Sequence, residues 1–338
     1  STRHASCREE LDCMKRELPE KTLISIVAPL FNEENNVPPF VRRLDQVFKR
    51  LGYNWELVFA MDPCTDRTQE VTISLLEQGY PIRLLRFSRR IGKPLSVIAG
   101  LDYTKGHASV VMDVDLQDPP ELIEEMIRKW REGYDVVIAQ RVSREGEHPL
   151  YLKAAELYYK IVARISDVDI PRNAGDYRLL DARVVEEMRR FREHHGFLRG
   201  ITAAVGFPTT LVPFHRDARL AGRTQISLRG AVNIAIDGIV PFSRVPIRSI
   251  FVLGAVMTLS AGAGVSLWMC AGLLQGFSHQ WAALLLCFLV PIFSGITIIC
   301  LGIVGEYVLR TYEEARGRPL YVVEEIYEAG SGGGKGRN

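Results

Sequence analysis

The sequence predicts an α/β domain with a mostly parallel sheet and helices on both faces, followed by a C-terminal hairpin of two transmembrane helices. Three observations favour this fold class. Short apolar runs alternate with amphipathic helical patterns in the N-terminal part of the chain. Two later stretches of 25 residues each contain no charged side chain. An acidic D-x-D sequence ends one of the apolar runs, where ligand-binding residues of parallel sheets are found.

Five apolar runs have the length and composition of strands: Leu23–Ala28, Trp55–Met61, Ile82–Phe87, Ser109–Met112 and Val136–Ala139. Helical patterns lie between them, at about Pro38–Leu51, Asp66–Gln78, Lys93–Thr104 and Pro120–Arg131. In the first helix, one apolar face is formed by Phe40, Val41, Leu44, Val47, Phe48 and Leu51. Strand–helix alternation of this kind produces a parallel sheet that is covered on both faces.

Polar residues follow three of these strands, where ligands bind in parallel sheets. Asn32 and Glu33 follow the first strand, Asp62 follows the second, and Asp113 and Asp115 follow the fourth. We expect the three groups to meet at one edge of the sheet. The turn after the first strand contains no glycine, so the G-x-G-x-x-G and Walker A phosphate-binding motifs are both absent. This argues against a nicotinamide-dependent oxidoreductase and against an ATPase.

The two charge-free stretches are Ile250–Leu274 and Trp281–Gly305. Each exceeds the ~20 residues that a helix needs to cross a bilayer. The alternative is a pair of buried core helices, which at this length rarely lack every charge. The flanks carry arginines at positions 244, 248, 310, 316 and 318, whereas the short link between the stretches has no Lys or Arg. The positive-inside rule therefore predicts that the N-terminal domain and both termini are cytoplasmic, in a plasma (inner) membrane protein with two spans.

The boundaries expected from these patterns are an N-terminal extension (1–21), a cytoplasmic α/β domain (22–226), an interfacial helix (227–246), the spans (247–305), a cytoplasmic C-terminal segment (306–329) and a flexible tail (330–338). Apolar residues recur at helical spacing in Ser227–Ser243 with polar residues between them. This stretch fits either a helix in the membrane interface or an ordinary amphipathic surface helix.

Charge and cysteine content exclude several classes of function. The net charge of +2 gives no sign of a nucleic-acid partner. The cysteines lie at positions 7, 13, 64, 270, 287 and 300, without a C-x-x-C pair, so we expect neither a disulfide framework nor a zinc site. The first twenty residues are charged and lack the apolar core of a secretory signal.

Three motifs resemble those of family 2 glycosyltransferases. Ile24–Glu34 resembles the opening motif of that family, and Asp113–Leu122 resembles the D-x-D-L-Q-D-P-P motif of enzymes that glycosylate polyprenyl phosphates. Gly305–Arg310 and Arg318–Tyr321 are similar to the post-membrane signature of the same group. The resemblance covers about residues 22–325. It is to the bactoprenol-phosphate glucosyltransferase type, which is related to dolichol-phosphate mannose synthases, and it implies a GT-A-like (Rossmann-like) nucleotide-sugar-binding fold.

The resemblance implies a donor site and a metal site. It assigns donor binding to Pro29, Glu33, Asp62, Gly92, Lys93 and Gln117, and catalysis to Asp113, Asp115 and Asp118. Asp113 and Asp115 match the pair that binds Mg²⁺ or Mn²⁺ in the family. On the donor side, the chain departs from the family pattern at three places: Met61 replaces a common Asp, Pro63-Cys64 replaces Gly-Ser, and Arg90 replaces a common Asn.

The resemblance also implies an acceptor site. The family's residues that bind the acceptor phosphate correspond in this chain to Arg141, Arg144, Asp176, Arg178, Arg199, Arg216 and Arg219. Arginine suits this task because its planar guanidinium grips phosphate in a bidentate manner. A phosphate monoester with a second pKa of about 6 is largely a dianion near neutral pH, so it is already a nucleophile and needs no general base.

These expectations combine into one function. The expected function is inverting transfer of a hexose, with glucose from UDP-glucose preferred, to undecaprenyl phosphate or another polyprenyl phosphate. Mannose from GDP-mannose or a modified UDP-sugar stays open as the donor. A processive polysaccharide synthase is disfavoured because the chain lacks a Q-x-x-R-W motif. An inactive membrane scaffold is suggested by Met61 and opposed by the intact acidic pair. Small residues in the first span favour a homo-oligomer, with a tetramer as one form.

Overall fold

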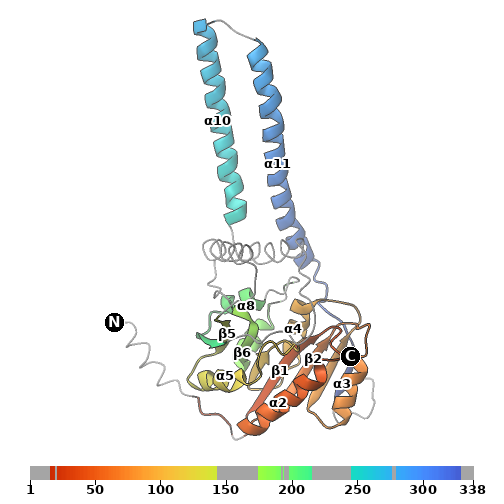
Figure 1. Ribbon diagram of the computed structural model, residues 1–338. Coiled ribbons are helices and arrows are strands. Elements are labelled where there is room, and N and C mark those ends of the chain that lie inside the picture. Colours follow the sequence, from red (N-terminus) through yellow and green to blue (C-terminus); the bar gives the residue numbers. More distant parts are fainter. Residues whose placement is uncertain are drawn as a thin grey trace, which may run out of the picture. The chain divides into compact units, whose positions relative to one another are not determined.

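The structure is a computed structural model that describes residues 16–19, 21–142, 174–191, 193, 198–214, 245–275 and 279–328. The described residues divide into two compact units. One unit holds a β-sheet with the helices that cover it, and the other holds the long helices α10 and α11 (Figure 1). Arg144, Arg216, Arg219 and the stretch 227–244 of the expected interfacial helix lie outside the described residues.

In the described part of the chain, eight strands form one sheet in the order β7-β5-β6-β4-β1-β2-β3-β8. The strands are β1 (Leu23–Leu30), β2 (Asn54–Met61), β3 (Ile82–Phe87), β4 (Ala108–Val111), β5 (Val136–Arg141), β6 (Ala174–Asp181), β7 (Thr209–Phe214) and β8 (Val323–Glu328). The pairs β1–β2, β1–β4, β2–β3 and β5–β7 are parallel, and β3–β8, β4–β6 and β5–β6 are antiparallel. The predicted mostly parallel α/β fold is confirmed.

The helices of this unit are α2 (Val37–Leu51), α3 (Thr68–Glu77), α4 (Lys93–Asp102), α5 (Leu122–Arg131), α7 (Ala182–Met188) and α8 (Leu198–Ala204). The first four coincide with the helices expected from sequence periodicity, to within a few residues at each end. The helix α2 has prolines in its first turn and ends at Gly52, which adopts a left-handed conformation.

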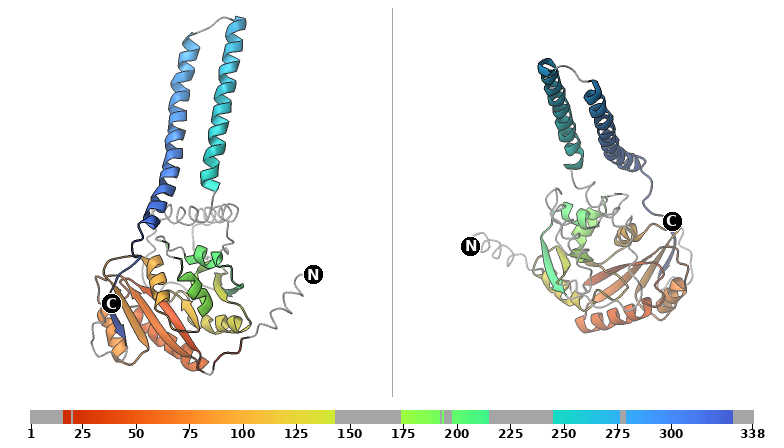
Figure 2. Two further views of the ribbon diagram at one scale, coloured as in Figure 1. Left: turned by 180° about the vertical axis from the view of Figure 1, so that it is seen from behind. Right: turned by 45° about the horizontal axis from the view of Figure 1, so that its top comes forward.

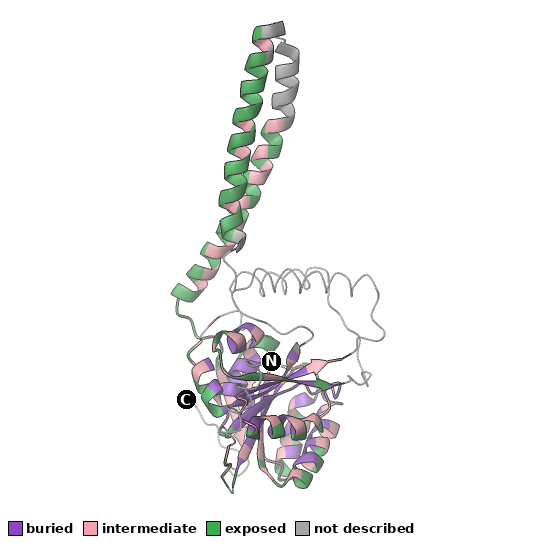
Figure 3. Cartoon of the chain, turned by 90° about the vertical axis from the view of Figure 1, so that its left-hand side faces the viewer, coloured by how far each residue is buried: buried purple, intermediate pink, exposed green. Residues whose placement is uncertain are grey.

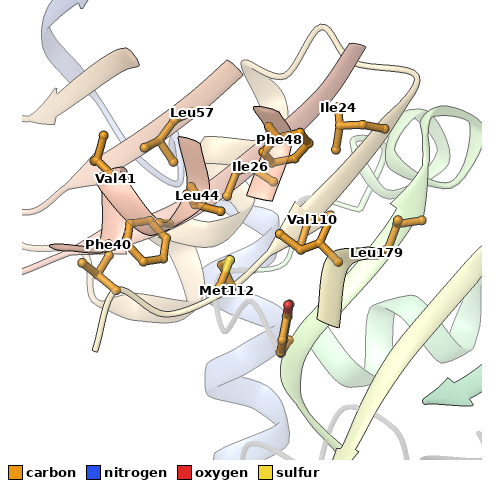
Figure 4. Close-up of a cluster of buried hydrophobic side chains, with 14 of the residues drawn as sticks. Ile24, Ile26, Phe40, Val41, Leu44, Phe48, Leu57, Val110, Met112 and Leu179 are labelled. Atoms are coloured by element: carbon orange, nitrogen blue, oxygen red, sulfur yellow. The ribbon is translucent and has the colours of Figure 1, made fainter. Parts of the chain in front are cut away.

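A hydrophobic core lies between the sheet and the apolar faces of α2, α3 and α5. Along β1, Ile24, Ile26 and Ala28 all belong to this core because alternate side chains of a strand face the same way. Figure 4 shows Phe40 and Leu44 of α2 in the same cluster as Ile24 and Ile26 of β1. Both side chains are fully buried, and burying one such side chain stabilises a fold by roughly 1.5–3 kcal/mol.

The helix α4 packs on the opposite face of the sheet, and Gly100 permits the close contact. A methyl group built on Gly100 would lie 2.4 Å from Cγ1 of Val27 in β1 and 3.6 Å from Cβ of Ala60 in β2. The first distance is far below van der Waals contact. Glycine at this position therefore sets how closely α4, which begins at Lys93, approaches the strands.

Replacing Gly100 with Ala should destabilise the fold by about 1–3 kcal/mol, because the methyl group overpacks the contact with Val27. Thermal unfolding followed by tryptophan fluorescence measures the loss. In the double variant G100A/V27A the smaller side chain at position 27 leaves room for the new methyl group. Its loss in free energy of unfolding should therefore be about 1 kcal/mol smaller than the sum of the losses in the two single variants. Strict additivity would show that the contact does not constrain α4.

The strand β8 adds to the edge of the sheet by pairing antiparallel with β3. Arg86 of β3 forms ion pairs with Glu325 at 2.8 Å and Glu324 at 3.0 Å. Just before β8, the Tyr321 hydroxyl donates to the Asp102 carboxylate at the end of α4 at 2.6 Å, and Val322 O accepts from Ser88 N at 3.1 Å. A segment that follows the second long helix thus completes the sheet and contacts both β3 and α4.

The second unit is a pair of long helices, α10 (Val245–Gln275) and α11 (His279–Ala315), which lie side by side in both views of Figure 2. Two windows have a mean hydropathy of 2.0: Ile247–Cys270 and Leu289–Ala315. None of either window is buried inside the protein, and Figure 3 shows most of their described residues as exposed. The alternative of two buried core helices therefore does not fit, whereas both helices are long and apolar enough to cross a bilayer.

Candidate active site

The sheet topology gathers the predicted site residues at one edge. The strands β1 to β4 are parallel to one another, so their carboxyl ends share an edge. Because β6 is antiparallel to both β4 and β5, the end of β5 and the start of β6 lie at this edge too. The loops after β1, β2, β3 and β4 are therefore neighbours there, together with Arg141 and Asp176.

The loops after β1 and β2 are joined by hydrogen bonds. Asn32, which adopts a left-handed conformation at φ 56°, accepts from Thr65 N at 2.8 Å and donates to Thr65 Oγ1 at 3.1 Å. The backbone N–H of Glu33 donates to Thr68 Oγ1 at 2.8 Å, and its carboxylate accepts from the side chain of Asn36 at 2.6 Å. Pro29 is half-buried at the end of β1. Glu33, a predicted donor-binding residue, thus sits in a cross-linked pair of loops, and Pro29 lies in the strand that leads into the first of them.

Asp62 fixes the loop that leads into α4. Its side chain is 3% exposed, and its two carboxylate oxygens accept from Ile91 N at 2.9 Å and Gly92 N at 3.0 Å. Gly92 has φ 84° and ψ 160° and precedes the first residue of α4, Lys93. Such a backbone conformation is readily adopted only by glycine. Asp62 therefore holds the turn from which Lys93 projects.

Replacing Asp62 with Asn should loosen this loop. The Asn side chain has one oxygen, which can accept from one of the two N–H groups. The other N–H then faces the NH₂ group and loses its hydrogen-bond partner, which costs about 1–3 kcal/mol of stability. Hydrogen exchange at Ile91 and Gly92 should accelerate in D62N and stay unchanged in D45N, which alters a partly exposed carboxylate on α2. Unchanged exchange in D62N would contradict the anchoring role.

Acidic and basic side chains alternate in a row of ion pairs across the site. Lys93 Nζ lies 2.7 Å from Asp113 Oδ2 and 3.4 Å from Asp176 Oδ2, and Arg199 Nε donates to Asp176 Oδ1 at 3.0 Å. Burial alone would lower the pKa of Lys93, but the carboxylates of Asp113 and Asp176 outweigh it and raise that pKa above its usual value. Burial likewise favours a raised pKa for Asp176, and the charges of Arg199, Lys93 and Arg178 overcome it and lower that pKa. Lys93 and Asp176 are therefore both charged near neutral pH.

The D-x-D turn has a strained backbone. Leu116 is 6% exposed and adopts φ 58°, which an L-residue with a side chain of this size seldom does. Asp115 Oδ1 accepts from Gln117 N at 3.2 Å, which closes the turn. Asp118 is 2% exposed, and its Oδ1 lies 3.9 Å from a guanidinium nitrogen of Arg141.

The acidic pair fits a hard divalent cation. Mg²⁺ usually takes one or two protein carboxylates and completes its shell with phosphate oxygens and water. The residues that the structure describes contain no cluster of three or more His, Cys, Asp or Glu side chains suited to a metal. Asp113 and Asp115, two carboxylates in one turn, match the number of protein ligands that Mg²⁺ usually takes.

The predicted acceptor residues differ in their exposure. The side chains of Arg141, Arg199 and Asp176 are 25%, 28% and 30% exposed. Arg178 is only 1% exposed, and it donates to Gly175 O at 2.8 Å and Asp176 O at 3.4 Å. Burial lowers the pKa of Arg178 to about 10. Arg178 thus braces the start of β6, beside the three partly exposed residues.

Sequence reasoning gave no role to two residues that meet at this edge. The guanidinium carbon of Arg90, in the loop after β3, lies 3.9 Å from the centroid of the Phe31 ring, in the loop after β1. Neither residue was predicted to have a role. The signal available was the run Arg89-Arg90 shortly before Gly92-Lys93, which concentrates positive charge on a single loop.

The chain matches known proteins along most of its length. Residues 25–189 match the family model described as "Glycosyl transferase family 2". The chain is 40% identical over 307 residues to the "Uncharacterized glycosyltransferase YkcC" of Bacillus subtilis, which covers 90% of this chain and 94% of that protein. It is 35% identical over 309 residues to the "Prophage bactoprenol glucosyl transferase homolog" of Escherichia coli, with 90% and 99% covered.

A third relative is the "Bactoprenol glucosyl transferase" of Shigella phage SfX, at 33% identity over 306 residues, with 89% of this chain and 98% of that protein covered. Among solved structures, glucosyl-3-phosphoglycerate synthase from Mycobacterium tuberculosis matches at 18% identity with a TM-score of 0.44, and the match covers 69% of this chain and 84% of that one.

Proposed function

Because this chain belongs to glycosyl transferase family 2 and is related to bactoprenol glucosyl transferases, we propose that it transfers glucose from UDP-glucose to undecaprenyl phosphate at the membrane surface. The observation that carries the proposal is the contact of Lys93 with both Asp113 and Asp176. Through Lys93, the acidic pair expected on the donor side is connected to the acidic and basic residues expected on the acceptor side.

On the donor side, the bond between the sugar carbon and the diphosphate oxygen breaks, and UDP leaves with the bonding electrons. A divalent cation, Mg²⁺ or Mn²⁺, held by Asp113 and Asp115 would neutralise the charge that develops on the diphosphate. Lys93 supplies a further positive charge on the same side, from a loop that Asp62 fixes. A rigid loop matters because preorganised charges need no rearrangement as the bond breaks.

On the acceptor side, an oxygen of the lipid phosphate forms the new bond to the sugar carbon. Arg141 and Arg199 are partly exposed at this edge, next to Asp118 and Asp176, and they hold the phosphate in line. Asp176 orients Arg199 through a 3.0 Å hydrogen bond. Attack from the face opposite the leaving UDP inverts the anomeric centre, so an α-linked UDP-glucose gives a β-linked lipid phosphosugar.

The acceptor's long isoprenoid tail requires a membrane, and α10 and α11 have the length and hydropathy to anchor the enzyme there. We place the catalytic domain on the cytoplasmic side of the inner membrane because arginines flank the two spans and are absent from the link between them. Protease added to inverted membrane vesicles should digest the catalytic domain, whereas protease added to intact spheroplasts should leave it whole. The reverse result would overturn this orientation.

The test of the reaction uses the full chain in nanodiscs with undecaprenyl phosphate, Mg²⁺ and a panel of labelled donors: UDP-glucose, GDP-mannose and a UDP-amino sugar. UDP-glucose should label the lipid phase, with a product mass equal to undecaprenyl phosphate plus one hexose. EDTA should abolish the labelling. Labelling from GDP-mannose alone would refute the choice of donor, and no lipid labelling from any donor would refute the proposed function.

A further inference from the structure

The loop between β3 and α4 concentrates positive charge at the donor edge. Three of five consecutive residues are basic: Arg89, Arg90 and Lys93. Lys93 reaches Asp113 at 2.7 Å, so the loop lies against the D-x-D turn. Its backbone is held on the other side by Asp62, which accepts from Ile91 N and Gly92 N.

These backbone bonds decide how the loop can bind an anion. Glycine-rich loops before a helix commonly bind phosphate with their own N–H groups. Here the N–H groups of Ile91 and Gly92 are occupied by the Asp62 carboxylate, and Pro94 at the start of α4 has no N–H. Positive charge for a diphosphate at this loop must therefore come mainly from side chains.

Arg90 is the side chain that is held in place for this role. Its guanidinium stacks on the Phe31 ring at 3.9 Å, and such a cation–π contact at an exposed site contributes about 0.5–1 kcal/mol. Among the residues that the structure describes, Arg90 forms no ion pair, unlike Arg86 in β3, which binds two glutamates. The contact with the ring restrains the guanidinium group and leaves its N–H groups available for oxygen acceptors.

We propose that Arg90 binds the diphosphate of the nucleotide donor, with Phe31 as the platform that orients its guanidinium. The proposal rests on the proposed function, because it assumes a nucleoside-diphosphate sugar as donor. A diphosphate is favoured over a nucleobase because the planar fork of arginine matches pairs of phosphate oxygens. Arg90 would act beside Lys93, with one basic side chain on each side of the Asp62-bound turn.

The test measures ligand binding by calorimetry on the full chain in nanodiscs with Mg²⁺. R90Q should weaken UDP binding about tenfold, because it loses charge-assisted hydrogen bonds, and should leave uridine binding unchanged. R90K keeps the charge but loses the planar fork, so its affinity for UDP should fall in between. F31L keeps Arg90 but removes its platform, and should weaken UDP binding about threefold. R131Q, which removes an exposed arginine at the end of α5, should bind UDP like the wild type.

Two results would overturn the assignment. Equal UDP affinity in R90Q and the wild type would show that Arg90 does not contact the donor. An equal loss for uridine and UDP in R90Q would assign Arg90 to the nucleoside instead. The series is separable from the proposed function: wild-type protein that binds UDP but transfers no sugar to lipid refutes that function, and the variants still decide the role of Arg90. Wild-type protein that binds no UDP refutes both.

Discussion

Replacing Asp115 with Asn is expected to reduce turnover about 1,000-fold while the protein stays folded, because removing one carboxylate of a metal-binding pair costs several kcal/mol of charge stabilisation. Asp115 lies in the turn that Leu116 and Gln117 close, and it is partly exposed at the sheet edge rather than part of the core. The amide is nearly isosteric, so the turn geometry should persist. The measurement is single-turnover transfer of labelled glucose to lipid, together with thermal unfolding.

The matched control is D45N, which makes the same chemical change in a carboxylate on α2 that pairs with Lys49. D45N should retain wild-type turnover. Mn²⁺ binding, followed by its paramagnetic resonance signal, should weaken in D115N and not in D45N. If D115N and the wild type have equal activity and equal Mn²⁺ affinity, the acidic pair is a solvated turn, and an inactive scaffold becomes the better explanation of the chain.

Replacing Lys93 with Met should lower the rate of sugar transfer roughly 100-fold, which is typical for the loss of one preorganised group that stabilises transition-state charge. Lys93 is the cation between Asp113 and Asp176, so its loss also leaves two carboxylates facing each other without the intervening charge. The Met side chain preserves the length and the apolar contacts of the stem. Rates measured at saturating UDP-glucose separate this effect on chemistry from a simple loss of donor affinity.

The conservative variant K93R serves as the control because it keeps the charge and should recover part of the rate. K49M removes a lysine that is paired with Asp45 on the surface of α2, and it should have no effect. A K93M protein that differs from the wild type only in its Michaelis constant for the donor would assign Lys93 to ground-state binding alone. That result would contradict the proposal that Lys93 stabilises the charge on the departing diphosphate.

Local sequence patterns were sufficient to predict the strands and helices of the central part of the fold. The strands β1 to β5 and the helices α2 to α5 have strong periodicity, and each is bounded by turn residues, so the parallel sheet was predictable. Both long apolar helices were predictable from their length, because an uncharged run of about 25 residues is typical of a membrane-spanning helix. Loops after parallel strands share an edge, so the neighbourhood of Asp62 and Asp113 followed from the fold.

The three strands that the sequence did not reveal are held mainly by distant partners. The strand β8, Val323–Glu328, contains three glutamates, so its sequence alone predicts a charged loop. It becomes a strand because Arg83 and Arg86 of β3 stand opposite its acidic side chains. The strands β6 and β7 likewise depend on pairing with β5, from which they are separated by many residues. Strand propensity is set largely by such neighbours, so a single segment carries little signal.

The site was predictable in its residue types and less so in its contacts. Asp113 and Asp115 follow directly from the D-x-D motif. The anchoring of Gly92 by Asp62, and the bridge from Lys93 to Asp176, join segments far apart in the chain, so only the folded structure shows them. The stacking of Arg90 on Phe31 also joins two loops, and nothing in either loop alone indicates it.

The position of β8 has a consequence for how the protein is made. Its partner β3 ends at Phe87, yet β8 begins only at Val323, after both long helices have been synthesised. While the ribosome is still producing those helices, the outer edge of β3 has no neighbour, and an uncovered strand edge invites pairing with other nascent chains. The catalytic domain therefore reaches its native state only after translation has passed the hairpin, so delivery of the hairpin to the bilayer is expected to precede the last step of enzyme maturation.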